Sequence, residues 1–225
     1  MSTEEMTTEN ESATSRRWFL GAAAAVAAGG VLAACSSDDS KVDTGAASTT
    51  VAGGASTTAA TGGAGGDAKV AALAASLEVL AVGTYKAALD AATANKLGTV
   101  PPAVATFATT AMGHHQMALD TWNKVLTGAG QPAVSAPPAS LKATVDAEFA
   151  KVKDVVGVAK LALLLEQTAA DTYLGATQTL TGKDALTTAG ALQSVDQEHA
   201  AILLFVLGMY PVPDVFQKTD KAFKG

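Results

Sequence analysis

Residues 77–85 read Leu-Glu-Val-Leu-Ala-Val-Gly-Thr-Tyr, and residues 165–173 read Leu-Glu-Gln-Thr-Ala-Ala-Asp-Thr-Tyr. The two segments share Leu, Glu, Ala, Thr and Tyr at matching positions, so they form an internal repeat. In each copy Glu and Tyr are seven residues apart, which places both side chains on one face of a helix. A carboxylate on an apolar helix face is costly to bury without a partner. We therefore expect Glu78 and Glu166 to be paired, hydrogen-bonded or metal-bound.

Apolar residues at helical spacing continue on both sides of the repeat, from Asp67 almost to the end of the chain. Pro101 and Pro102 begin one helix, and Gly128 and Gly130 end it. The pattern predicts four main helices and one shorter polar helix, at about 67–94, 102–126, 140–153, 157–180 and 183–207. Because no strand-like alternation occurs and several loops are short, the predicted fold is an all-α antiparallel bundle.

Histidines on two of these helices are candidate partners for the repeated glutamates. His115 lies on an apolar stripe of the 102–126 helix, and His199 lies on a similar stripe of the 183–207 helix. When the two helices are aligned on these histidines, Met112 and Asp196 each stand three residues earlier. Residues three apart lie on adjacent ridges of one helix face, so Asp196 and His199 can chelate one ion.

This arrangement resembles the ferritin-like di-metal bundles, in which two helices each give one Glu and the other two each give Glu-x-x-His. The resemblance covers about residues 67–210 and is nearest to exported bacterial ferritin-like domain proteins, which are related to desiccation-associated proteins. It implies a ferritin-like four-helix bundle with Fe or Mn in its core. The metal ligands that it implies are Glu78, His115, Glu166, Asp196 and His199. Tyr85 and Tyr173 would stand beside them as hydrogen-bond donors or electron relays.

Met112 stands where the family pattern has a bridging Glu, and its thioether is a soft, weak ligand for Fe or Mn. Two ions close together need several carboxylates to offset their repulsion, so this departure favours one ion over two. Four residues would hold the single ion, namely Glu78, His115, Glu166 and His199. His114 or Glu198 would replace one of them if the helix facing were one residue different.

Two functions follow from this pattern. The first is a metal-dependent redox or oxidative-stress protein that oxidises Fe(II) or removes peroxide. The second is a non-catalytic, metal-free structural, stress-related or binding module, in which the same side chains form a hydrogen-bonded polar core. Met112 favours the second function and the retained Glu and His positions favour the first, so the sequence leaves enzymatic activity open.

Two motifs near the N-terminus indicate export and lipid attachment. Residues 15–20 read Ser-Arg-Arg-Trp-Phe-Leu and resemble the twin-arginine export motif, with its arginine pair at Arg16 and Arg17. A weakly apolar stretch rich in Ala and Gly follows. Residues 32–35 read Leu-Ala-Ala-Cys and resemble the lipobox of bacterial lipoproteins. In that family the chain is cut before the cysteine, which implies that acyl chains are attached at Cys35.

These motifs and the local composition divide the chain into four parts. We expect a signal peptide over 1–34, a Ser/Thr/Gly/Ala linker over 35–66, the bundle over 67–210 and a tail over 211–225. The linker has no apolar periodicity and is expected to act as a flexible tether. The tail carries Lys218, Lys221 and Lys224, which are expected to face solvent or lipid headgroups.

The motifs also predict where the protein acts and what it contacts. It would lie at the outer face of the cytoplasmic membrane, or on the periplasmic or outer-membrane side in a Gram-negative cell. Its partners would be the membrane, through the lipid on Cys35, and the twin-arginine export machinery. A net charge of −6 argues against a nucleic-acid partner, and a single cysteine excludes a disulfide within the chain.

Overall fold

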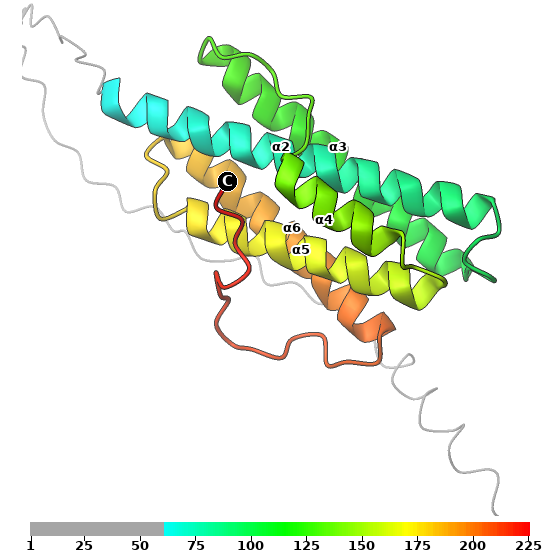
Figure 1. Ribbon diagram of the computed structural model, residues 1–225. Helices are drawn as coiled ribbons and strands as arrows, with labels where there is room; N and C mark the ends of the chain where they lie inside the picture. The colour runs from blue at the N-terminus through cyan, green and yellow to red at the C-terminus, as the bar shows by residue number, and fades with distance from the viewer. Residues whose placement is uncertain (1–60) are drawn as a thin grey trace, which may run out of the picture. The chain divides into compact units, whose positions relative to one another are not determined.

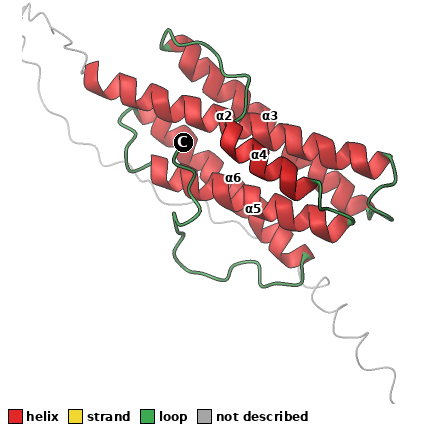
Figure 2. Ribbon diagram, in the orientation of Figure 1, coloured by secondary structure: helices red, strands yellow, loops and turns green. Residues whose placement is uncertain are grey.

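The computed structural model describes residues 61–225, and Figure 2 shows this part of the chain as helices and connecting loops. Its α-helices are α2 (Thr61–Thr93), α3 (Pro102–Gly128), α4 (Ala139–Phe149), α5 (Val155–Ala176) and α6 (Lys183–Val206). No strand occurs within residues 61–225, and the predicted all-α fold is confirmed. Arg16, Arg17 and Cys35 lie outside the described residues, as do the predicted signal peptide and most of the predicted linker.

The helices form two hairpins that pack against each other as a four-helix bundle (Figure 1). Short loops join α2 to α3 and α5 to α6, and across the bundle α2 packs against α5 while α3 packs against α6. Residues 129–154 connect α3 to α5 and include α4, which runs along the bundle. This crossover makes α5 antiparallel to α2, so the two copies of the repeat meet in opposite directions.

The crossover helix α4 covers the seam between α2 and α5. Val145 is its buried residue, and it packs in one apolar cluster with Leu80 of α2 and with Leu161 and Leu165 of α5. Most other residues of α4 are exposed, so this cluster is its main attachment. The α2–α5 side of the bundle is therefore closed next to the repeat.

Alanine allows the helices to pack closely, because its small side chain lets backbones approach one another. Fully buried alanines occur on all four bundle helices, namely Ala71, Ala75, Ala111, Ala170 and Ala189. By length and composition, Gly65–Thr93 is apolar enough to cross a membrane. In the bundle, however, this segment packs against α3 and α5 and carries the buried Glu78 near its middle. Its hydropathy is thus explained by its place as a core helix.

Three helix ends differ from the sequence-based expectation by four residues or more, and one of them is the end of α4 at Phe149 rather than near Lys153. The helix α2 begins at Thr61 rather than near Asp67, so it extends into the segment expected to be linker. The helix α5 ends at Ala176 rather than near Leu180. The chain turns after Ala176, and this turn places Leu180 in the apolar cluster around Trp122. Leu180 is thereby buried although it lies beyond the end of the helix.

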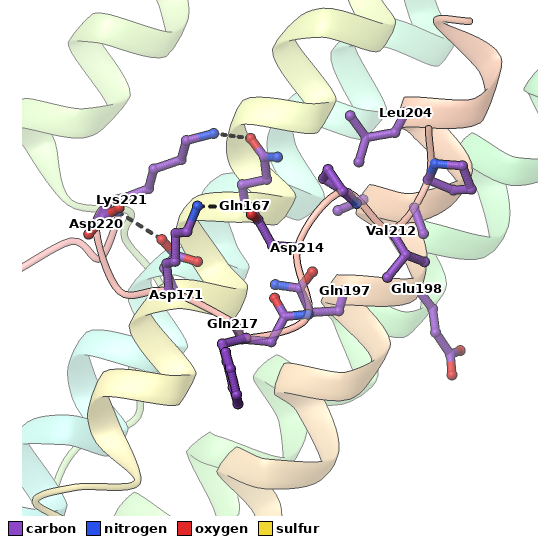
Figure 3. Close-up of a pocket in the computed structure, with 16 residues that line it drawn as sticks. Gln167, Asp171, Gln197, Glu198, Leu204, Val212, Asp214, Gln217, Asp220 and Lys221 are labelled. Atoms are coloured by element: carbon purple, nitrogen blue, oxygen red, sulfur yellow. Dashed lines mark hydrogen bonds and ion pairs between the residues drawn. The ribbon is translucent and has the colours of Figure 1, made fainter. Parts of the chain in front are cut away.

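The C-terminal tail folds back along α5 instead of facing solvent throughout. The backbone N–H of Lys221 donates to Asp171 Oδ2 at 2.8 Å, and that of Phe223 donates to Thr172 Oγ1 at 2.8 Å. The ammonium group of Lys221 also donates to the side chain of Gln167 (Figure 3). The side chain of Lys221 is exposed, as expected for the tail lysines, but its backbone and ammonium group also fasten the tail to α5.

Between α6 and this attachment the tail arches over a cavity of about 420 Å³ (Figure 3). The cavity walls carry amides and carboxylates, among them Gln197, Glu198 and Asp214, next to the exposed ring of Phe216. Glu198 therefore faces the outer side of α6. It does not point into the bundle core, where an alternative metal ligand would have to lie.

Asp67 of α2 fastens the loop between α5 and α6. Its carboxylate accepts hydrogen bonds from the backbone N–H of Thr181 at 2.9 Å and of Gly182 at 2.6 Å. The bond from Thr181 is the main cause that lowers the pKa of Asp67 below its ordinary value of 3.8. Because Gly182 is the N-cap of α6, the carboxylate also lies near the positive end of that helix.

We expect Asp67→Ala to lower the free energy of unfolding by about 1 kcal/mol, because two backbone N–H groups lose their acceptor. Folding lowers the pKa of this carboxyl, so its contribution is present above pH 3.8 and is lost as the pH falls through the folded-state pKa. Urea unfolding at neutral pH and at about pH 2 measures both effects. Asp90→Ala, on an exposed pair with Lys86, is the control and is expected to cost about 0.3–0.5 kcal/mol. An equal loss for Asp67→Ala at both pH values would contradict this assignment.

Candidate metal centre

The two copies of the repeat contact each other through a reciprocal pair of hydrogen bonds. Tyr85 O–H donates to Glu166 Oε1 at 2.5 Å, and Tyr173 O–H donates to Glu78 Oε1. The reciprocity follows from the antiparallel packing of α2 and α5, because the Glu of each copy then stands opposite the Tyr of the other. All four side chains are 3% exposed or less, so the repeat forms a buried polar layer.

The two tyrosines remain hydrogen-bond donors in this layer. Burial, together with the facing glutamate, raises the pKa of Tyr85 well above its ordinary value of 10.0. The same causes raise the pKa of Tyr173. Each phenol therefore keeps its proton and neutralises part of the charge of the carboxylate that it contacts.

His115 of α3 joins the two glutamates. Its Nδ1 lies 2.7 Å from Glu78 Oε2, and its Nε2 lies 3.2 Å from Glu166 Oε1. An ionised carboxylate only accepts hydrogen bonds, so without a metal both ring nitrogens donate in this arrangement, and a bound ion would take the place of the proton on one of them. Burial by itself would lower the pKa of His115, but Glu166 and Glu78 raise it well above its ordinary value of 6.5.

Glu166 is the centre of the network. It accepts hydrogen bonds from Tyr85 and His115, and its Oε2 lies 3.2 Å from Nδ1 of His199 on α6. Burial would raise the pKa of Glu166, but His115 and His199 lower it to about 2. The side chain is therefore an ionised carboxylate with no exposed surface, held by donors from three other helices.

Asp196 differs from the other buried polar side chains of the site, because one of its oxygens has no hydrogen-bond partner within the described residues. It lies on α6 and is 3% exposed, and the oxygen concerned is Oδ2. Burial raises the pKa of Asp196 well above its ordinary value of 3.8, and the nearby charges of Glu78 and Glu166 raise it further. A buried carboxylate oxygen without a donor costs about 1–3 kcal/mol or more, so its position requires an explanation.

A metal ion fits the residues around this oxygen. His115, Glu166, Asp196 and His199 each offer one nitrogen or oxygen atom, and these atoms lie within 4.8 Å of one another. Atoms that share an ion at bonds of about 2.1 Å stand at most about 4.2 Å apart, which is close to the observed spread. Two imidazoles and two carboxylates without a thiolate suit ions such as Fe, Mn or Zn. Asp196 belongs to this set and carries an oxygen, Oδ2, that has no hydrogen-bond partner within the described residues.

The structure brings four of the five predicted ligands together, namely His115, Glu166, Asp196 and His199. The fifth, Glu78, contacts His115 but is not part of the group. Glu78 accepts from His115 Nδ1 and from Tyr173. Met112 is half-buried and packs against the apolar cluster of Tyr85 and Ala111. The position where the family pattern has a second bridging carboxylate thus carries an apolar side chain.

Two residues extend the network beyond the predicted set. Trp122 Nε1–H donates to Tyr173 Oη at 2.8 Å, and the Trp122 side chain is fully buried. Sequence spacing could have indicated it, because Trp122 follows His115 by seven residues on the same face of α3. His114 lies with its Nδ1 3.0 Å from His199 Nε2. From the sequence, His114 is expected only as a replacement ligand, because adjacent residues on a helix point in different directions.

Comparison with known proteins agrees with this architecture. Residues 66–209 match the family described as ferritin-like domain, and the match spans most of α2 through to the end of α6. No curated protein matches the chain.

We expect Asp196→Asn to raise the free energy of unfolding of the metal-free protein by about 1–3 kcal/mol, because it removes a buried, unpartnered carboxylate oxygen. The new amide can donate to nearby glutamates, whereas the aspartate repels them. Chemical unfolding after chelator treatment measures the change. Asp146→Asn, on the exposed face of α4, is the control and is expected to stay within about 0.5 kcal/mol of the parent chain. A destabilised Asp196→Asn variant would contradict the unpaired state of this oxygen.

Proposed function

This chain belongs to the ferritin-like domain family, and on that basis we propose that its bundle binds one Fe or Mn ion through His115, Glu166, Asp196 and His199. The observation that carries the proposal is Asp196, a buried member of this group of four whose Oδ2 has no hydrogen-bond partner within the described residues. An unpaired buried carboxylate lowers the stability of a fold, so a cation is the partner that its position favours. The nitrogen and oxygen donors also suit these metals.

One divalent ion also matches the charge of the site. Glu78, Glu166 and Asp196 bring three negative charges when all are ionised, and all three are buried. A divalent ion offsets two of them, and the phenol O–H groups of Tyr85 and Tyr173 donate to the glutamates that carry the rest. A second ion would need a further carboxylate, because two cations close together repel each other.

A bound Fe or Mn ion would supply one-electron chemistry, and we propose Fe(II) or a peroxide as the substrate class, in an oxidative-stress role. The residues of this chain would hold the site in place. Glu78 accepts from Nδ1 of His115, which fixes the ring orientation, and Tyr85 does the same for Glu166 by donating to it. Tyr173 and Trp122 form a buried, hydrogen-bonded aromatic pair next to Glu78, and this pair would exclude water from that side.

The proposal places this activity at the cell envelope. It rests on the resemblance of residues 15–20 to the twin-arginine motif and of residues 32–35 to a lipobox, both outside the described part of the chain. Twin-arginine export is associated with proteins that fold before export. A bundle that binds its ion only when folded would suit this route, because the metal could be loaded before the chain crosses the membrane.

A metal-free structural module is the second candidate function. The observation in its favour is that Glu78, His115, Glu166 and His199 all have hydrogen-bond partners within the chain. Such a layer would fix the register of an alanine-rich bundle without any ion. Asp196 separates the two candidates, because the hydrogen-bonded layer leaves its Oδ2 without a protein partner, whereas a metal ion would bind it.

We expect the full chain, purified from cells supplied with iron and manganese, to carry about one ion per molecule by elemental analysis. Glu166→Ala and His199→Ala are expected to lose the ion, because each removes a ligand atom. Glu198→Ala, on the outer face of α6, is the control and is expected to keep it. The bound ion is also expected to stabilise the fold by about 2.7 kcal/mol at a free concentration of one hundred times Kd.

Two results would contradict the single-ion site. Two ions per chain would show that the site assembles without a carboxylate at Met112. No ion after reconstitution of a folded chain would favour the metal-free structural module.

We expect Cys35→Ser to move the mature protein from the membrane fraction to the soluble fraction of the envelope, because each buried acyl methylene contributes about 0.8 kcal/mol. Replacing Arg16 and Arg17 with lysines is expected to leave the precursor inside the cell. Cell fractionation followed by immunoblotting detects both changes, with Ser36→Ala as the control that keeps the parent location. Membrane retention of the Cys35→Ser variant would show that another part of the chain anchors it.

A further inference from the structure

One residue connects the buried network with solvent. The candidate ligands and both tyrosines are buried, whereas His114 is half-buried. Its Nδ1 lies 3.0 Å from His199 Nε2, and the two rings stack with centroids 5.2 Å apart and planes 10° apart. Within the described part of the chain, His114 is thus the member of this network that solvent reaches.

His199 presents one ring nitrogen to the inside of the bundle and one to the outside. Its Nδ1 faces Glu166 Oε2 at 3.2 Å, and its Nε2 faces His114. Either nitrogen of an imidazole can bind a metal. Two nitrogens that share an ion at right angles, with bonds of about 2.1 Å, stand about 3.0 Å apart. This spacing agrees with the distance between His114 Nδ1 and His199 Nε2.

The other sides of the bundle are closed near the buried ligands. Tyr85 and Tyr173 cross the α2–α5 seam with their hydrogen bonds, and α4 covers that seam through Val145. The hairpin pairs α2–α3 and α5–α6 pack along their length, whereas α3 and α6 touch each other least among the neighbouring bundle helices. A Cβ added at Gly113, next to His114, would meet no atom within 4 Å, so the surface there is open.

We propose that His114 Nδ1 and His199 Nε2 form an outer capture position through which a divalent transition-metal ion reaches and leaves the buried ligands. This inference rests on the proposed metal function and adds the route to it. The outer position consists of imidazole nitrogens, so it selects transition-metal ions over Ca²⁺ and Mg²⁺, which prefer oxygen ligands. His199 belongs to both positions and links them, because its second nitrogen already faces Glu166.

The proposal predicts a kinetic effect without a change in affinity. Removing a transfer position slows binding and release by the same factor, whereas removing a resident ligand weakens binding. The assay follows Co(II) binding by stopped-flow absorbance in the full chain carrying Cys35→Ser, which removes its single thiol. We expect His114→Ala to slow both Co(II) association and chelator-driven release by about tenfold and to leave Kd unchanged.

Two further variants separate a capture position from a hydrogen-bonding role. His114→Gln keeps a side chain that can hydrogen-bond His199 but loses the imidazole, so it is expected to be as slow as His114→Ala. Gln116→Ala, at an exposed site on α3, is the matched control and is expected to keep the parent rates.

Five results would overturn the proposal. Unchanged rates in His114→Ala, or parent rates in His114→Gln, would show that the imidazole of His114 does not carry the ion. A raised Kd or an altered spectrum of bound Co(II) would make His114 a resident ligand or a residue that orients His199. If the folded parent chain takes up no Co(II), the proposed metal function fails as a whole, and this result is distinct from any effect specific to His114.

Discussion

The constraint on which this bundle depends is the burial of an ionised carboxylate at Glu166. A charge without exposed surface is tolerated only when donors surround it, and Glu166 receives them from Tyr85, His115 and His199. These donors come from α2, α3 and α6, so one side chain on α5 fixes the relative register of all four bundle helices. A core made largely of alanine packs closely but distinguishes poorly between registers, since neighbouring alanines are alike. The polar layer supplies the specificity that the small apolar side chains do not.

Both copies of the repeat contribute to this polar layer in the same way. Two antiparallel helices that each carry Glu and Tyr seven residues apart satisfy one another in pairs, and His115 then bridges the two glutamates. Apolar clusters lie on both sides of the layer, one around Trp122 and Leu126 and the other around Tyr85 and Leu203. The low local dielectric strengthens each hydrogen bond in between and makes any unpaired polar atom expensive. Asp196 differs from the rest of the layer, because its Oδ2 has no hydrogen-bond partner within the described residues. It lies beside both histidines that could share an ion with it. A locally unfavourable residue in an otherwise satisfied core is characteristic of a functional site.

The helices and the burial of the two glutamates could be predicted from the sequence, because both depend on local periodicity. Apolar spacing predicted the four main helices, and the position of Glu78 and Glu166 on apolar stripes predicted that they are buried with partners. The same reasoning treated Glu78 as an equal ligand, whereas the structure places it behind His115. It did not predict that the backbone N–H of Lys221 binds Asp171, because this contact joins segments far apart in the chain. Periodicity carries no information about such distant pairs.

The sequence by itself determined which residues share a helix face, since the α-helical repeat of 3.6 residues fixes that angle within each helix. It thereby determined an all-α bundle with two glutamates, two tyrosines and histidines turned inward. Only the tertiary structure decided how each helix is rotated and shifted against its neighbours. That choice left Asp196 without a partner, set His114 against the outer nitrogen of His199 and made the repeat reciprocal. The physical reason is that helix rotation and register follow from side-chain packing and from the pairing of buried charges across the bundle, and neither is encoded in the spacing of residues along one helix.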